Sequence, residues 1–277
     1  MRRLDRPAYA ARDVLGLCIA SIQDEDLTDR LKVIAEAVEE AETDYIEQAQ
    51  DGTLFSIAQT EGVEDVTVEE MKRVYNGTFV RSKGTRDIYD TIKKLSPNDI
   101  CPMCGQRTVG TLDHYLPQSL HSTLVVTPAN LLPSCADCNK AKLDAQPGAA
   151  DEQTLHPYFD DVDDGVWLYA TVEQTDPAAL LFYVEPPAAW AATKQARVRL
   201  HFRTFGLGAL YASHSAVELN NIRYGLQRIA ERGNSDDIRA ELLRRAVSSE
   251  ASQINSWQTA TYRALAASEW FCNGGYN

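Results

Sequence analysis

No hydrophobic run in this sequence of 277 residues approaches the roughly twenty apolar residues that a transmembrane helix requires. The sequence also contains no internal repeat, no low-complexity segment and no Walker motif for nucleoside triphosphates. These absences exclude membrane-spanning proteins, repeat proteins and P-loop ATPases. The hydrophobic content of 44% and charged content of 24% are typical of a soluble globular protein with one large domain or two small ones.

Positive charge is scarce, and its distribution is uneven. The formal net charge is −13, with 18 acidic and 6 basic side chains in residues 1–70, and nine acidic and no basic side chains in 151–193. Basic side chains outnumber acidic ones only in 71–110, by 8 to 3, and in 194–277, by 11 to 7. The total charge argues against simple nucleic-acid binding. Phosphates respond to local fields, however, so these two basic segments remain candidates for contact with them.

The cysteine pattern argues against a disulfide framework. Four of the six cysteines form two Cys-x-x-Cys pairs, Cys101 with Cys104 and Cys135 with Cys138, while the other two stand alone. This usage fits a reducing compartment, so we expect a cytoplasmic protein. Each pair can present two sulfurs to one ion, and four thiolates satisfy tetrahedral Zn²⁺, so the sequence predicts one structural zinc site.

Polar residues around the two pairs make this stretch more specific than a zinc clamp alone. Asp113 and His114 lie between the pairs, Asn130 precedes the second pair, and Asn139 follows Cys138 directly. Residues 101–142 resemble the HNH endonucleases, whose ββα-metal module is often stabilised by a four-cysteine zinc site. The resemblance covers about forty to sixty residues and extends to His156-Pro157, where related sequences also carry a His-Pro pair.

The resemblance implies a role for each polar residue. His114 corresponds to the general base, Asp113 and Asn139 to ligands of a catalytic Mg²⁺ or Mn²⁺, and Asn130 to the residue that orients the histidine. Asn139 stands where other members carry histidine, so the literal pattern is H-N-N. His156 is a further possible site residue.

These roles agree with the chemistry of the side chains. A neutral imidazole with a pKa of roughly 6.5 can deprotonate water at neutral pH. Oxygen ligands from Asp113 and Asn139 suit hard ions such as Mg²⁺ or Mn²⁺. Successive side chains on a strand point to opposite faces, which would separate Asp113 from His114. The resemblance implies a twisted strand end and loop that bring both to one site, and Pro117 is consistent with this.

Basic residues on both sides of the motif are candidates for phosphate contacts: Arg81, Lys83, Lys93, Lys94, Lys140 and Lys142. The alternative is that they form only a solvated basic face.

The predicted fold is α+β and mostly helical, with an HNH ββα-metal module and structural zinc flanked by helical regions. We expect a helical region at 1–95, the nuclease module at 96–160, and a β-hairpin followed by helices at 161–277. In the first region, one amphipathic helix should extend from Leu27 to Tyr45 and end at Asp51-Gly52. A helix capped by Thr67 should end at Asn76-Gly77, and another should begin near Thr85.

The predicted elements of the other two regions follow from short apolar runs. In the module, strands are expected at 106–112 and around Val125-Val126, with a helix from about Ser134. Residues 166–173 and 179–185 read as a hairpin. Helices are expected from 188 onward, one of them capped at Asn234 or Ser235.

The leading functional prediction is a metal-dependent endonuclease that nicks or cuts DNA. The flanking regions resemble bacterial HNH proteins, some of which act in anti-phage systems beside an ATPase. The chain is therefore expected to be an effector subunit that works with an ATPase or sensor protein, which must be a separate chain because no Walker motif is present. The alternative is a zinc-ribbon module that binds nucleic acid or protein without catalysis.

Overall fold

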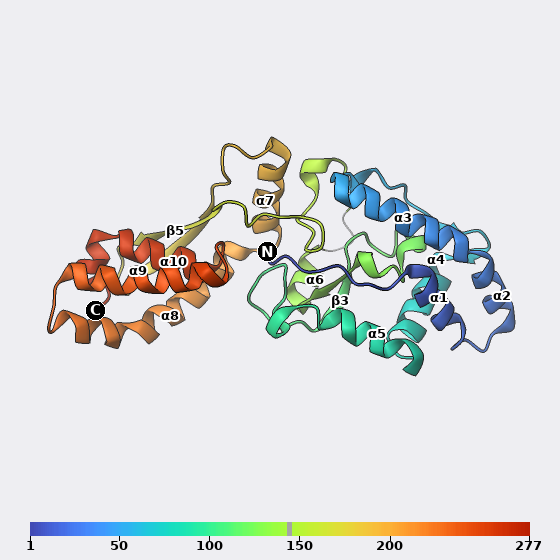
Figure 1. The fold of residues 1–277 in the computed structure, drawn as a ribbon, viewed down its shortest axis with the longest axis horizontal. Helices are drawn as coiled ribbons and strands as arrows, with labels where there is room; N and C mark the ends of the chain where they lie inside the picture. Colours follow the sequence, from blue (N-terminus) through green and yellow to red (C-terminus); the bar gives the residue numbers. More distant parts are fainter. Residues whose placement is uncertain (143–145) are drawn as a thin grey trace. The chain divides into compact units, whose positions relative to one another are not determined.

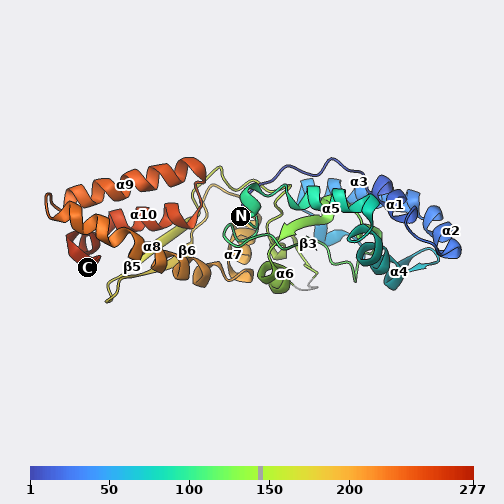
Figure 2. The same cartoon turned by 90° about the horizontal axis from the view of Figure 1, so that it is seen from below.

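The computed structural model describes residues 1–142 and 146–277, which form two compact units, Met1–Asp161 and Val162–Asn277. Both combine helices with small antiparallel sheets of two strands, so the protein belongs to the α+β class and is mostly helical, as predicted (Figures 1 and 2). The predicted N-terminal region and nuclease module share the first unit. Among the described residues, no helix is long and apolar enough to cross a membrane.

The first unit begins with three helices, α1 (Ala11–Ile19), α2 (Glu25–Val33) and α3 (Ala35–Asp51). The prediction of one continuous helix from Leu27 through Tyr45 is wrong. The chain turns at Ile34, where φ is −81° and ψ is 0°, and this turn separates α2 from α3. Leu31, Ile34 and Val38 are nevertheless all buried, so the spacing of the stripe continues across the turn and does not reveal it. The end of α3 is confirmed, since Gly52 adopts φ 72°.

The next segment supplies one wall of the candidate site. A short hairpin, β1 (Gly62–Val63) with β2 (Val66–Thr67), leads into α4 (Val68–Arg73), and Thr67 caps this helix as predicted. The helix does not end at Asn76-Gly77. It continues as a π-helix, η2 (Val74–Phe79), before α5 (Lys83–Lys93) begins.

The ββα order of the predicted module is present. Strand β3 (Thr111–His114) pairs antiparallel with β4 (Leu131–Ser134), and α6 (Ala136–Lys142) follows. The first strand begins five residues later than predicted, because Thr108 pairs with Ile100 beside the first cysteine pair.

The second strand does not lie at Val125-Val126. These two residues lie between the short helices η4 (Ser122–Leu124) and η5 (Pro128–Asn130), and their side chains are buried in the main core of this unit. Burial, not strand pairing, explains why this pair is apolar.

The second unit contains the predicted hairpin, β5 (Leu168–Glu173) with β6 (Ala179–Val184). Four α-helices accompany it: α7 (Ala192–Thr204), α8 (Leu207–Ala230), α9 (Ser235–Ser252) and α10 (Trp257–Ala267). Of the two predicted caps, Asn234 is the N-cap of α9, and it forms a capping box. One face of the hairpin, including Leu180 and Phe182, is buried, and α8 and α10 pack on the hairpin.

Candidate functional site

The four paired cysteines converge on one point. All four are buried, and their sulfur atoms lie within 4.8 Å of one another. Four sulfurs each about 2.3 Å from a tetrahedral zinc would be separated by roughly 3.8 Å, so this arrangement fits a structural zinc site. The remaining two cysteines, Cys18 and Cys272, are buried elsewhere.

Local backbone geometry prepares the sulfurs for a metal. Amide groups donate to them, from Arg107 to Cys104 and from Cys138 to Cys135, both at 3.4 Å. Hydrogen bonds among the four sulfurs lower the pKa of the Cys104 and Cys135 thiols and raise the pKa of Cys101 and Cys138. Thiolates are the form that binds zinc.

A salt bridge also joins the segments that carry the two cysteine pairs, because Arg107 Nε lies 2.8 Å from Asp137 Oδ2 in α6. The segment of the first pair therefore contacts α6 through this salt bridge as well as through the sulfurs.

A cavity of about 570 Å³ lies beside the module, and three of the four polar residues of the predicted motif, Asp113, His114 and Asn139, line it. Its walls come from β3 and the following loop, from α6, and from the π-helix η2. The lining includes Asp113, His114, Asn139, Lys140 and Lys142. Asp113 and His114 are neighbours on a strand, yet both line the cavity, and His114 is the last residue of β3. The strand end thus brings a carboxylate and an imidazole to one site.

The environment of His114 fixes its protonation state. Its side chain is 6% exposed, and Nε2 lies 2.8 Å from the backbone oxygen of Val125. Because a carbonyl can only accept, Nε2 carries the proton and Nδ1 keeps its lone pair. Burial lowers the pKa of His114 to about 4, with the Lys142 charge lowering it further and the Val125 carbonyl opposing both. The imidazole is therefore neutral at physiological pH.

Asn130 holds the loop between β3 and β4. Its Oδ1 accepts from the Leu116 amide at 2.7 Å, and its Nδ2 donates to the backbone oxygens of Leu116 and Leu124 at 3.0 and 3.2 Å. The residue is fully buried and does not line the cavity. It fixes the position of Leu124 and therefore of the next residue, Val125, whose carbonyl accepts the hydrogen bond from His114.

Lys142 was predicted to contact phosphate from the surface, but its side chain is buried. It is 9% exposed, and its ammonium donates to the backbone oxygen of His114 at 2.6 Å. The same ammonium lies 3.9 Å from Asp113 Oδ2. Its charge thus balances that of Asp113 inside the cavity wall.

The remaining predicted residues are distributed around the unit. Lys140 is exposed at the cavity, and Arg81, Lys83 and Lys94 are exposed outside it, with Lys93 half-buried.

His156 is placed elsewhere and does not line the cavity. It is buried among aromatic rings, accepts from the Tyr158 amide at Nδ1 and bonds Tyr45 through Nε2. Its position is that of a core residue.

Two cavity residues come from outside the predicted module. Tyr75 and Asn76 reach the site from η2, about forty residues before the strand that carries His114. The Asn-Gly pair at 76–77 signals a helix end in sequence, and no local pattern indicates a π-turn or its distant neighbour. Only the folded chain reveals this wall.

Comparisons with known proteins add one relative. The chain is 27% identical over 297 aligned positions to Protein ea31 of Escherichia phage lambda, covering 99% of this chain and all of the relative. Scans against protein-family models and against solved structures found no match. The relative's name states no activity.

The first prediction concerns the metal cluster. Elemental analysis of purified protein should find one zinc per chain. Structural zinc typically contributes about 10–16 kcal/mol in small peptides, so Cys138→Ser should lose the metal and unfold the module. Cys272→Ser, also a buried cysteine but outside the cluster, should retain zinc. Folded protein without zinc would contradict the assignment.

The second prediction concerns the protonation of His114. The folded chain should keep this imidazole neutral down to about pH 4, whereas the unfolded chain takes up the proton near pH 6.5. Stability from this group is therefore complete above pH 6.5 and declines as the pH falls toward 4, by on the order of 3 kcal/mol in total. Nitrogen NMR of the imidazole at pH 5.5–8 should show no titration, and a midpoint between 6 and 7 would contradict the prediction.

Proposed function

We propose that this protein is a metal-dependent HNH endonuclease that hydrolyses phosphodiester bonds of DNA. One observation carries the proposal: a single cavity is lined by Asp113, His114 and Asn139, at the junction of two strands and a helix in ββα order. A buried four-cysteine cluster closes the same module. These are the residues and the order that the family resemblance implies.

His114 has the properties of a general base. Its Nδ1 has a lone pair and makes no hydrogen bond to any described part of the chain. A water in the cavity can give its proton to Nδ1 while Nε2 keeps its own proton and donates it as a hydrogen bond to the Val125 carbonyl. That carbonyl would stabilise the resulting imidazolium.

The oxygen donors in the cavity fit a hard divalent ion. The side chains of Asp113 and Asn139 both line it and would hold Mg²⁺ or Mn²⁺ together with water. When bound, such an ion stabilises negative charge on the phosphate and on the leaving oxygen. Lys142 would then contribute charge balance from the wall, and Lys140, exposed at the cavity, can contact a neighbouring phosphate.

Other basic residues of the first unit extend the proposed DNA contact. Arg81 precedes α5, Lys83 begins it and Lys94 follows it; all three are exposed, and α5 packs against β3 and β4. Most non-specific DNA affinity comes from such phosphate contacts and is therefore sensitive to salt.

A zinc-ribbon module without catalysis is the competing function. Such a module needs its cysteines, but it needs neither a neutral buried histidine nor a carboxylate and an amide gathered in the same cavity. Divalent-metal-dependent nicking of a plasmid would distinguish the two functions.

The third prediction is that His114→Ala abolishes plasmid nicking while zinc content and folding are retained. Loss of the general base should reduce the rate by roughly 10²- to 10⁴-fold. Asp113→Ala and Asn139→Ala should raise the Mg²⁺ concentration needed for half-maximal rate. His214→Ala, on α8 of the second unit, is the matched control and should nick normally. Wild-type rates from His114→Ala would show that another group is the base.

We also propose that the chain acts as an effector subunit in a bacterial defence system, with an ATPase or sensor protein as partner. The support is electrostatic, since residues 1–70 carry a net −12 and 151–193 a net −9. Acidic α2 and α3 belong to the same unit as the cavity and oppose the broad approach of a duplex. A partner that covers these helices or supplies its own DNA-binding surface would remove this repulsion.

The fourth prediction follows from that repulsion. The isolated chain should nick plasmid weakly, and the product of a neighbouring gene should raise the rate most at low salt. Above about 150 mM salt, where surface charges are well screened, the gain should shrink. Strong nicking by the chain alone that no candidate partner changes would contradict the effector proposal, although it would leave the nuclease proposal intact.

A further inference from the structure

Tyr75 lies directly against the imidazole of His114. The two ring centroids are 4.5 Å apart, and the planes meet at 63°, the edge-to-face arrangement that aromatic rings favour. Tyr75 is 6% exposed and lines the same cavity. A residue from outside the ββα elements therefore forms one wall of the histidine's environment.

The backbone around Tyr75 is a π-helix whose open carbonyl groups are satisfied by a dedicated side chain. The hydroxyl of Thr85 donates at 2.7 Å to the carbonyl of Thr78 and lies 3.1 Å from that of Phe79, and Thr85 is fully buried. The amide of Val80 donates to the carbonyl of Tyr75 at 3.0 Å, which closes the wide turn. Such π-turns are rare and occur frequently at functional sites.

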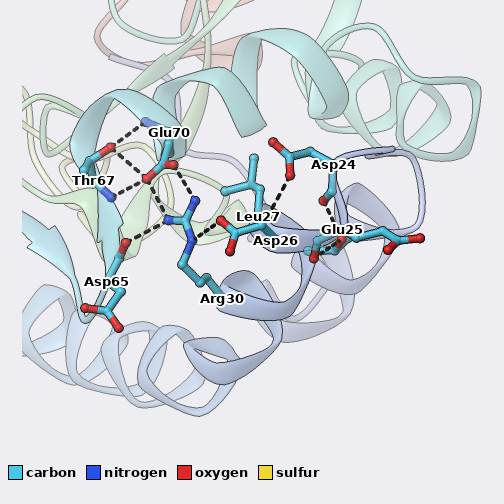
Figure 3. A network of polar contacts seen from close by, with 9 residues as sticks. Asp24, Glu25, Asp26, Leu27, Arg30, Asp65, Thr67 and Glu70 are labelled. Carbon is cyan, nitrogen blue, oxygen red and sulfur yellow. Dashed lines mark hydrogen bonds and ion pairs between the residues drawn. The ribbon is translucent and has the colours of Figure 1, made fainter.

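The helix before this π-turn is anchored at its start (Figure 3). The Glu70 carboxylate accepts from the Thr67 amide at 2.9 Å, which completes the capping box, and pairs with Arg30 of α2 at 2.7 Å. Arg30 also donates to the backbone oxygen of Asp65 at 2.8 Å. The hydrogen bonds from Arg30 and from Thr67 lower the pKa of Glu70 to about 2, so this carboxylate is ionised above about pH 4. Since η2 continues directly from α4, the anchor limits movement of Tyr75.

The imidazole of His114 thus has two neighbours that restrict its rotation. The Val125 carbonyl holds Nε2, and the ring of Tyr75 blocks one side. If the imidazole rotated about its bond to Cβ, Nε2 would lose its hydrogen bond to the Val125 carbonyl.

We propose that Tyr75 is a positioning residue of the site, whose ring holds the His114 imidazole with Nδ1 directed at the cavity. This inference rests on the proposed nuclease function, and it assigns the π-turn a role in catalysis. The ring provides the contact and the hydroxyl is not required for it, so phenylalanine should replace tyrosine without loss.

The test compares three variants of the full-length protein. Tyr75→Leu should lower kcat for plasmid nicking by roughly 10²-fold with little change in KM, because a small misplacement of a catalytic group has effects of this size. Tyr75→Phe should restore the wild-type kcat. Phe79→Leu is the matched control: Phe79 belongs to the same π-helix and its ring centroid lies 5.5 Å from that of Tyr75, so the core is weakened similarly while the Tyr75–His114 contact is kept.

Nitrogen NMR of His114 provides a measurement that does not depend on activity. Wild type, Tyr75→Phe and Phe79→Leu should show the Nε2–H tautomer, whereas Tyr75→Leu should show a mixture of tautomers. If Tyr75→Leu does not fold, nuclear Overhauser contacts between the two rings in the wild type replace it, and their absence would overturn the inference.

The outcomes separate the inference from the proposed function. Normal kcat and an unchanged tautomer in Tyr75→Leu, or an equal loss of kcat in Phe79→Leu, would overturn the role of Tyr75. A wild-type protein that never nicks DNA but shows the predicted tautomers would instead overturn the nuclease proposal and leave the ring contact intact.

Discussion

Convergence of the four cysteine sulfurs is the constraint on which the site depends. One pair precedes β3 and the other lies where β4 passes into α6, so joining them sets the position of the helix relative to the strand. That position places Asn139 in the lining of the same cavity as Asp113 and His114. A metal that binds all four sulfurs would add to the apolar packing of Leu112, Val125 and Leu131 in the core of this unit.

Buried hydrogen bonds fix the conformation of the loop between β3 and β4, where regular secondary structure is absent. Between β3 and β4 the chain has only short helical turns, yet Asn130 ties both sides of this loop together with three hydrogen bonds. The Val125 carbonyl then selects one tautomer of His114, and Lys142 balances the neighbouring Asp113. Because buried polar groups are costly when unpaired, each of these contacts specifies one arrangement.

Local chemistry made part of this structure predictable. The cysteine spacing, the Thr67 and Asn234 caps, Gly52 and the hairpin at 168–184 each depend on residues close together in sequence, and the structure agrees with all of them. The turn at Ile34, the π-helix and the position of β4 depend on packing between distant segments. For the same reason the sequence identified Asp113, His114 and Asn139 as candidates, but did not indicate Tyr75 or the burial of Lys142 and His156.

The charges inside the cavity differ from those on the surface outside it. Inside the cavity, burial keeps the proposed base neutral and charges are paired. Outside it, α3 carries seven acidic and no basic side chains, while basic residues lie on α5 and on both sides of it. For the proposed nuclease, this charge distribution would make binding of DNA depend on a partner.

The most direct measurement of the central claim is the location of a divalent ion. Crystals grown with Mn²⁺ should show one anomalous peak in the cavity, coordinated by oxygens of Asp113 and Asn139, and distinct from the signal at the four cysteines. In Asp113→Ala the cavity peak should disappear while the cysteine site stays filled. A cavity without Mn²⁺, or a peak that survives both Asp113→Ala and Asn139→Ala, would contradict the account.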